Sequence, residues 1–110
     1  MICRTWRGWT TLENAEPYER YLTAELFPRV RSELAAVGYR GYQVLQTARA
    51  GEIEFVTMLW FESLETVRSF AGHAYETPVI SEKARGLLAH WQEWCDHYEV
   101  RGLEAPAALH

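Results

Sequence analysis

The sequence predicts an α+β fold of the ferredoxin-like βαββαβ type, with a four-stranded antiparallel sheet. Three observations lead to this prediction. A long segment near the start has apolar residues at helical spacing, a hairpin of strand-forming residues follows it, and a second helical region precedes a last strand-like segment. The chain has 110 residues, which is the length of one domain. The expected strand order is 4-1-3-2, so that the first strand contacts the third and the last.

The first strand is predicted over residues 2–9, ICRTWRGW, because Ile, Thr and Trp favour extended backbone. Side chains alternate between the two faces of a strand. One face therefore carries Ile2, Arg4 and Trp6, which places a charged residue on an otherwise apolar face.

A helix is predicted after this strand. Asn14 is a suitable N-cap, and Gly38 is a suitable residue to end the helix. Pro28 lies inside the apolar stripe and should kink or split the helix, because proline lacks a backbone N–H. The stripe consists of Tyr18, Leu22, Leu26, Val30 and Leu34.

The hairpin comprises a strand over residues 42–48 and another over residues 52–61, with Ala50 and Gly51 near the turn. Both faces of the second strand are apolar. One face has Ile53, Phe55, Thr57, Leu59 and Phe61, and the other has Val56, Met58 and Trp60. A strand that is apolar on both faces is covered on both faces. The helices of one chain can cover one face, so we expect a second copy of the chain to cover the other.

The second helical region is predicted as two pieces. Ser63 is a suitable cap for a short helix that ends at Gly72. Ser81 begins another helical stretch, which extends to Trp91. The last strand is expected over residues 92–100.

This pattern divides the chain into a ferredoxin-fold domain over residues 1–100 and a tail over residues 101–110. The apolar fraction of 48% and the charged fraction of 24% are those of a folded domain rather than a disordered chain. The tail has a weak pattern, and we expect it to be mobile or to lie on a partner.

Composition argues against several classes of function. The net charge is −4 and Lys83 is the only lysine, so nucleic acid is not an expected partner. No apolar run is long enough to span a bilayer, and the N-terminus lacks the pattern of a signal peptide. We therefore expect a cytoplasmic protein with no membrane contact. Cys3 and Cys95 lack a metal-binding spacing, and no metal site is expected.

Three segments carry a family resemblance: RTWRGWTTLENAEPYERYL near the start, EFVTMLWFESLETVRSFAG in the middle and HYEV near the end. In this order, and on the predicted topology, they resemble the antibiotic biosynthesis monooxygenase (ABM) domain family. The resemblance extends over residues 2–100. It implies a dimeric α+β barrel, in which the two sheets of a homodimer face each other. It also implies cofactor-independent oxygenation of a small aromatic, polyketide-like substrate.

The implied chemistry takes its electrons from the substrate, which reduces oxygen as an anion. Such a site needs a base or a polar group that favours the anion, a donor for the developing negative charge, and a dry aromatic pocket. No metal or other cofactor is required. The candidate bases are His73, which follows Gly72, and His97 on the last strand; His90, late in a helix, is a third histidine for which a structural role is favoured. The alternatives are a surface loop position for His73 and a structural hydrogen bond for His97.

Asp96 and Arg4 are the other candidate catalytic residues. Asp96 shares a face of the last strand with Trp94 and Tyr98, so its carboxylate needs a partner. Arg4 is the matching charge on an apolar face of the neighbouring strand. We therefore expect an Arg4–Asp96 ion pair, which either belongs to the site or only fixes the strand register.

The aromatic residues expected to contact a flat substrate are Trp6, Trp60, Phe70 and Tyr75. Packing in the core or at an interface is the alternative for each of them. Two further functions stay open: a haem-binding or haem-degrading relative of the same fold, with His73 as the candidate ligand, and a non-catalytic dimeric ligand-binding module. A closed interior without a pocket would favour the module over both enzymes.

Overall fold

The structure is a computed structural model that describes residues 1–107. It contains an antiparallel sheet with β1 (Ile2–Thr10) at its centre. The sheet order is β2-β3-β1-β4, and β5 also pairs with β1. The other strands are β2 (Tyr39–Arg49), β3 (Glu52–Phe61), β4 (His90–Trp91) and β5 (Asp96–Glu99). This confirms the predicted α+β class, with the fourth strand of the expected order present as two pieces.

The first crossover is one continuous helical segment in three parts. Helix α1 (Ala15–Arg20) leads into a π-helical segment, Tyr21–Leu26, and then into α2 (Phe27–Leu34). A short 3-10 turn, Ala35–Val37, ends the segment before Gly38. Pro28 was expected to kink or split the helix. The structure instead widens the turn before it, where the N–H of Phe27 donates to the carbonyl of Leu22, five residues earlier.

The expected capping by the Asn14 side chain is wrong. Asn14 has helical backbone angles and its side chain makes no capping hydrogen bond. Its Nδ2 instead donates to the carbonyl of Leu87 over 3.2 Å. This bond ties the start of α1 to the end of α4 (Glu82–Leu87), so the amide links two helices rather than capping one.

The hairpin forms as predicted, and β2 is longer than expected because it starts at Tyr39. A bulge between Tyr39 and Gly41 interrupts its pairing with β3. Ala50 and Gly51 both have positive φ, at 51° and 82°, and such angles are typical of the two central residues of a type I′ turn.

The predicted cap at Ser63 and the predicted helix start at Ser81 are confirmed. The hydroxyl of Ser63 accepts from the N–H of Thr66 at the start of α3 (Leu64–Ala71), and the hydroxyl of Ser81 accepts from the N–H of Ala84 at the start of α4. The second helix ends earlier than expected. Leu88 already has extended angles, and Trp91 lies in β4 rather than in a helix.

The last strand is not continuous over residues 92–100, as the sequence predicted. Residues 92–95 leave the ladder between β4 and β5. The side-chain oxygen of Gln92 accepts from the N–H of Arg7, and the N–H of Cys95 donates to the carbonyl of Glu76 over 2.7 Å. These bonds satisfy the backbone locally and draw Cys95 toward the loop between α3 and α4.

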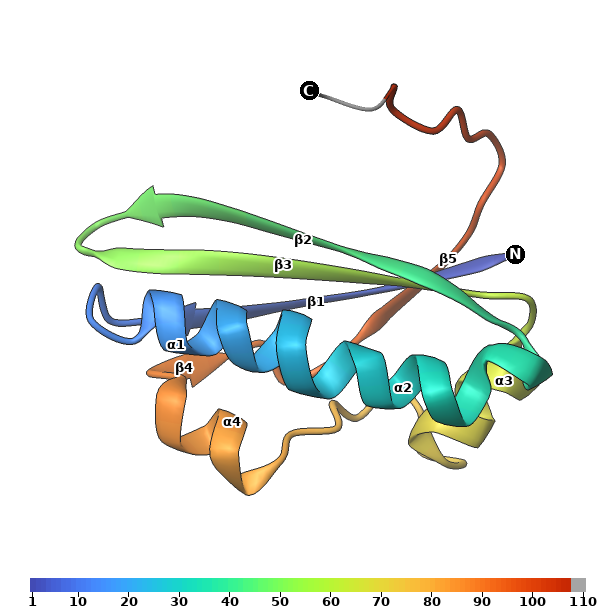
Figure 1. Ribbon diagram of the computed structural model, residues 1–110, viewed down its shortest axis with the longest axis horizontal. Coiled ribbons are helices and arrows are strands. Elements are labelled where there is room, and N and C mark those ends of the chain that lie inside the picture. The colour runs from blue at the N-terminus through green and yellow to red at the C-terminus, as the bar shows by residue number, and fades with distance from the viewer. Residues whose placement is uncertain (108–110) are drawn as a thin grey trace.

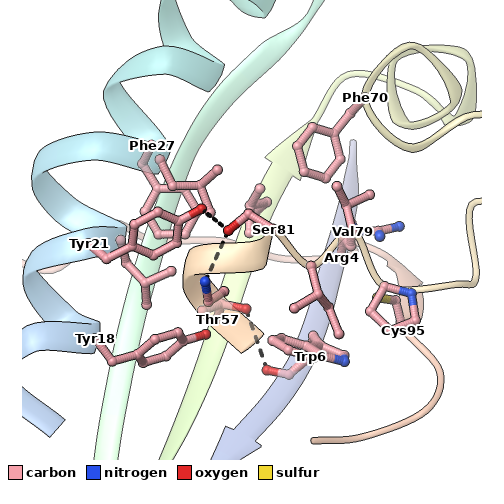
Figure 2. Close-up of a pocket in the computed structure, with 16 residues that line it drawn as sticks. Arg4, Trp6, Tyr18, Tyr21, Phe27, Thr57, Phe70, Val79, Ser81 and Cys95 are labelled. Carbon is pink, nitrogen blue, oxygen red and sulfur yellow. Dashed lines mark hydrogen bonds between the residues drawn. The ribbon is translucent and has the colours of Figure 1, made fainter. Parts of the chain in front are cut away.

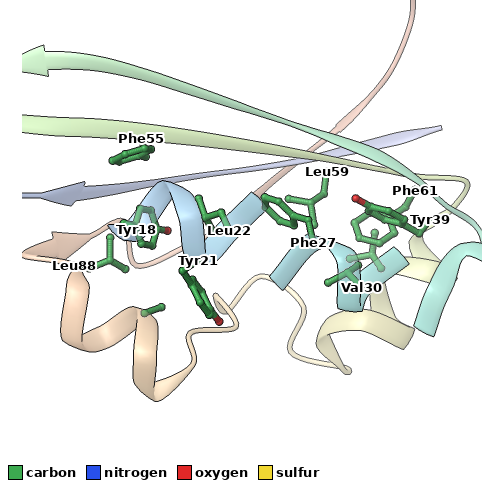
Figure 3. Close-up of a cluster of buried hydrophobic side chains, with 12 residues drawn as sticks. Tyr18, Tyr21, Leu22, Phe27, Val30, Tyr39, Phe55, Leu59, Phe61 and Leu88 are labelled. Atoms are coloured by element: carbon green, nitrogen blue, oxygen red, sulfur yellow. The ribbon is translucent and has the colours of Figure 1, made fainter. Parts of the chain in front are cut away.

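The helices all lie on one side of the sheet (Figure 1). The side chains buried between the two layers are mainly aromatic and aliphatic (Figure 3). Phe55 and Phe61 of β3 are 1% and 0% exposed, so the face with Ile53, Phe55, Thr57, Leu59 and Phe61 is the one that the helices cover. The buried cluster comprises Tyr18, Tyr21, Leu22, Phe27, Val30, Tyr39, Phe55, Leu59, Phe61, Val67, Ala84 and Leu88.

The opposite face of the sheet, which we call the outer face, is not covered by any element of the described chain (Figure 1). Its partly or fully exposed apolar residues include Leu45, Val56, Met58, Trp60 and Tyr98. Residues 101–107 have no regular secondary structure and run away from the sheet beyond β5 (Figure 1). The remaining tail residues, 108–110, lie outside the described residues. Within residues 1–107, no helix is both long and apolar enough to cross a membrane.

Replacement of Gly38 by alanine should destabilise the fold by about 1–3 kcal/mol. Gly38 has a φ of 123°, and a Cβ there would lie 2.5 Å from Oγ1 of Thr66. That oxygen is held in place because it donates to the carbonyl of Val37. The free energy of unfolding in urea measures the effect. Gly86→Ala is the matched control, because a Cβ at Gly86 in α4 meets no atom within 4 Å. Equal stability of the two variants would contradict the prediction.

Candidate functional site

A cavity of about 60 Å³ lies between the helix-facing side of the sheet and the helices (Figure 2). Its walls come from β1 and β3, from the helical segment around the π-helical turn, and from the loop between α3 and α4. Most of its lining is apolar or aromatic, with a few polar groups among them. The lining residues are Arg4, Trp6, Tyr18, Tyr21, Leu22, Leu26, Phe27, Thr57, Leu59, Phe70, Pro78, Val79, Ile80, Ser81, Ala84 and Cys95.

Arg4 is the charged residue of this cavity. It is only 4% exposed, because it occupies a helix-facing position of the central strand β1. Its Nη1 donates to the carbonyl of Tyr75 and lies 3.0 Å from Nε2 of His97, and its Nη2 donates to the carbonyl of Thr77 over 3.3 Å. Its guanidinium carbon lies 5.4 Å from the ring centre of Phe70. Arg4 therefore ties the loop between α3 and α4 to the sheet.

The positive charge of Arg4 has no carboxylate partner. None of the ion pairs among residues 1–107 includes it. A guanidinium has five N–H donors, and the three contacts described above use three of them. Burial lowers the pKa of Arg4, but an arginine side chain stays protonated in proteins. The cavity thus has a buried cation with two N–H donors that those contacts leave free.

His97 receives one of the Arg4 hydrogen bonds. Because a guanidinium can only donate, Nε2 of His97 must be the unprotonated acceptor, and the ring proton lies on Nδ1. Burial and, secondly, the nearby Arg4 charge lower the pKa of His97 below its usual 6.5. The ring also meets Tyr75 edge to face, with ring centres 5.0 Å apart. His97 is therefore a neutral imidazole whose basic nitrogen is already occupied, which corresponds to the structural hydrogen bond considered above.

The expected Arg4–Asp96 ion pair is wrong. In the antiparallel register Arg4 is opposite His97, and Asp96 is opposite Thr5. Directly opposite residues share a face of the sheet, so Arg4 and Asp96 point to different faces. Asp96 instead accepts a hydrogen bond from Nε2 of Gln92 over 3.1 Å. Alternation alone could not determine which residue of the last strand meets Arg4, because that depends on the register.

Two further candidates lie away from the cavity. His73 is exposed in the loop after α3 and lines neither this cavity nor the hollow described below. Trp60 pairs with Cys3 on the outer face of the sheet, so it is not part of the cavity wall. The other aromatic candidates come together around Arg4. Trp6 and Phe70 line the cavity, and Tyr75 holds Arg4 through its carbonyl.

Sequence reasoning missed several polar groups of the cavity. Tyr18 belongs to the apolar helical stripe and Tyr21 lies beside that stripe, yet both line the cavity. The hydroxyl of Tyr21 lies 2.6 Å from that of Ser81, so this pair links the helical segment to the start of α4 (Figure 2). Cys95 is buried, and burial raises the pKa of its thiol, so it is a protonated wall residue rather than a nucleophile. The tyrosine hydroxyls in and beside an otherwise aliphatic stripe were the sequence signal that could have indicated a polar cavity there.

A second, shallow hollow of about 420 Å³ lies on the other side of the Arg4–His97 contact. It opens on the surface beside β5 and is more polar than the cavity. Cys95 lines both spaces, so the side chains of Arg4, His97 and Cys95 separate them. The hollow is lined by Ile2, Leu64, Tyr75, Glu76, Cys95, Asp96, His97 and Glu99. Within residues 1–107, no group of three or more His, Cys, Asp or Glu side chains is placed to hold a metal ion.

Comparison with known proteins supports the fold. No protein-family model and no curated relative matches the chain. The structure is similar to the crystal structure of a protein from Bacillus cereus, described as "Putative Antibiotic Biosynthesis Monooxygenase". The TM-score is 0.64 at 17% sequence identity, and the match covers 96% of this chain and 97% of that chain. At this identity the similarity establishes a common fold.

The stability of the protein should fall as the pH decreases from 7 through the usual histidine pKa of 6.5. His97 has a lowered pKa when folded, so below 6.5 the unfolded chain binds more protons than the folded chain. His97→Gln should reduce this pH dependence, because an amide oxygen can accept from Arg4 without titrating. Urea unfolding between pH 5 and pH 7.5 measures the slope. His73→Gln, in an exposed loop, is the control and should keep the wild-type slope; equal slopes for all three proteins would refute the argument.

Proposed function

We propose that the chain is a cofactor-independent monooxygenase of the ABM type, which oxidises a small aromatic molecule as its anion. The fold shared with the Bacillus cereus protein supports the general type. The observation that carries the proposal is the buried cation: Arg4 forms part of an aromatic cavity and has no carboxylate partner.

A buried charge without a counter-charge is unfavourable, because the protein interior solvates it poorly. A bound anion would supply the missing partner, and Arg4 would lower the pKa of a ligand hydroxyl in return. The walls favour a flat ligand, since Trp6, Tyr21 and Phe27 offer ring surfaces. The proposed ligand is therefore a phenol or an enolisable aromatic ketone, which becomes planar and anionic in the site.

The proposed reaction needs only the substrate and molecular oxygen. The anion transfers electrons to oxygen and a carbon–oxygen bond forms; the O–O bond then breaks with loss of water. For an anthrone-type methylene group the balance is R₂CH₂ + O₂ → R₂C=O + H₂O, in which the carbon loses four electrons and each oxygen atom gains two. Arg4 stabilises the anion from which the electrons leave, and the apolar walls exclude water.

The side chains that line the cavity in residues 1–107 include no carboxylate and no imidazole. The nearest histidine, His97, uses its basic nitrogen to hold Arg4. We therefore assign His97 a positioning role and place the loss of the substrate proton at the binding step, to solvent, before the cavity closes. The non-catalytic binding module stays the alternative. The haem-binding alternative is not favoured, because His73 lines neither space.

The size of the cavity limits the substrate. A volume of about 60 Å³ is far below the ~300–1,000 Å³ typical of ligand pockets. A substrate of more than one ring requires a wall to move. The loop between α3 and α4 is the wall without regular secondary structure, and Pro78, Val79 and Ile80 contribute its lining. We expect this loop to move outward when the substrate binds.

The proposal includes a homodimer. The outer face of the sheet is uncovered in one chain, and it carries apolar side chains from β2, β3 and β5. A second copy packed face to face would bury these side chains and form the dimeric α+β barrel. The helix-facing cavity would then lie outside the dimer interface, so each chain would hold a complete site.

Arg4→Gln should lower kcat/KM for oxidation by about 100-fold, because it removes the charge that stabilises the substrate anion. Oxygen uptake with anthrone, 1,8-dihydroxyanthrone and 1-naphthol measures the effect. Arg20→Gln is the matched control, since Arg20 is exposed on α1 and binds Glu16. Binding of these compounds without oxygen uptake by the wild type would favour the non-catalytic module. An Arg4→Gln variant as active as the wild type would remove Arg4 from the mechanism.

Leu45→Arg should convert the dimer to a monomer, because it places a charge within the proposed interface. Leu45 lies on the outer face and is 41% exposed in the single chain. Sedimentation velocity on the wild type and the variant measures the mass. Leu12→Arg is the control: Leu12 is 62% exposed but lies in the turn before α1. A monomeric wild type at high micromolar concentration would rule out the proposed dimer.

A further inference from the structure

The hydroxyl of Tyr18 is a polar group of the cavity that the proposed mechanism does not use. Tyr18 is only 1% exposed, and its hydroxyl makes none of the side-chain hydrogen bonds among residues 1–107. Figure 2 shows it pointing away from α1, toward Thr57 and Trp6, with no hydrogen bond to any other lining residue. Tyr21 differs, because its hydroxyl already has Ser81 as a partner.

Among residues 1–107, the fully enclosed side-chain oxygen without a partner is that of Tyr39, so the Tyr18 hydroxyl borders the cavity instead of closed protein. A phenylalanine would fill the same place but would offer no donor to the cavity. The ring of Tyr18 packs edge to face on Phe55, with ring centres 5.0 Å apart, and this contact does not need the hydroxyl. The Tyr18 hydroxyl is therefore free to donate to a polar atom that enters the cavity.

The chemistry of that atom follows from the state of the phenol. Burial raises the pKa of Tyr18 well above its usual range, so the group is protonated and donates. A neutral acceptor oxygen, such as a carbonyl, is the matching partner. An anionic oxygen would instead be bound by Arg4.

Tyr18 and Arg4 come from different walls of the cavity, α1 and β1. Trp6 and Thr57 are paired across β1 and β3, and Arg4 lies two residues along β1 from Trp6. Figure 2 places Arg4 and Tyr18 on opposite sides of the cavity. A ligand that contacts both groups therefore has an oxygen function at each end of its aromatic ring.

We propose that Tyr18 is a specificity-determining residue, which donates a hydrogen bond to a neutral carbonyl oxygen of the ligand while Arg4 binds an anionic oxygen at the other end. The cavity then selects aromatic compounds with two oxygen functions on opposite sides of the ring system, one ionised and one neutral. This inference rests on the proposed function, because it takes Arg4 as the anion site.

The test compares two probes that are both carboxylate anions at neutral pH and nearly equal in size. 4-Formylbenzoate has a carbonyl opposite its carboxylate, and 4-methylbenzoate has only a methyl group there. Dissociation constants are measured by calorimetry for the wild type, Tyr18→Phe and Tyr21→Phe. Tyr18→Phe keeps the ring on Phe55, and its melting temperature verifies that it is folded.

The wild type should bind 4-formylbenzoate more tightly than 4-methylbenzoate. Tyr18→Phe should weaken binding of 4-formylbenzoate by about 3- to 10-fold and leave that of 4-methylbenzoate within about twofold. Tyr21→Phe should keep the wild-type preference, because the hydroxyl that it removes is already bonded to Ser81.

The outcomes separate the two proposals. If both probes bind and Tyr18→Phe affects them equally or not at all, the role of Tyr18 is refuted while the anion site stands. If neither probe binds the wild type, the anion site is refuted, and the inference about Tyr18 with it. If the expected preference is found but no substrate consumes oxygen, the role of Tyr18 is upheld and the oxygenase assignment is refuted.

Discussion

The burial of Arg4 is the constraint on which the site depends. A guanidinium enclosed at the centre of a sheet must have its N–H groups satisfied, and here the carbonyls of Tyr75 and Thr77 and the ring of His97 do so. These contacts determine where the loop between α3 and α4 lies, and the N–H of Cys95 reinforces that position by binding the carbonyl of Glu76. At the break between β4 and β5, the bonds of Gln92 to Arg7 and of Cys95 to Glu76 replace the regular ladder. The cavity and its unpaired charge are thus two results of one buried side chain.

The parts of the fold that were predictable depend on local chemistry. The hairpin, the cap at Ser63 and the helix start at Ser81 follow from residue type and spacing over a few positions. The site depended on a long-range quantity, the register between β1 and β5. A shift of one residue decides whether Arg4 meets His97 or Asp96, and alternation within each strand is compatible with both. The irregular segment 92–95 could not be predicted from the sequence either, because side-chain and loop partners replace its ladder bonds.

The fold and the chemistry rest on different grounds. A match over 96% of the chain at 17% identity establishes the arrangement of strands and helices, and many unrelated functions use this arrangement. The chemical argument comes from side chains of this sequence: a cation without a counter-charge, a neutral histidine behind it and aromatic walls. A ferredoxin-like domain with an aliphatic residue in place of Arg4 would keep its sheet and lose the reason to bind an anion.

The π-helical turn over Tyr21–Leu26 is equivalent to an ordinary α-helix with one inserted residue. Each α-helical residue adds a rotation of about 100° around the axis. Deletion of one residue from the turn would restore regular winding and rotate α1 by that angle relative to α2. Because Phe27 and the rest of α2 are anchored on the sheet, α1 would take the change, and the Tyr18 hydroxyl would leave the cavity. The number of residues in this turn, more than their identity, therefore determines whether the Tyr18 hydroxyl reaches the cavity. The insertion or deletion of a single codon changes that number.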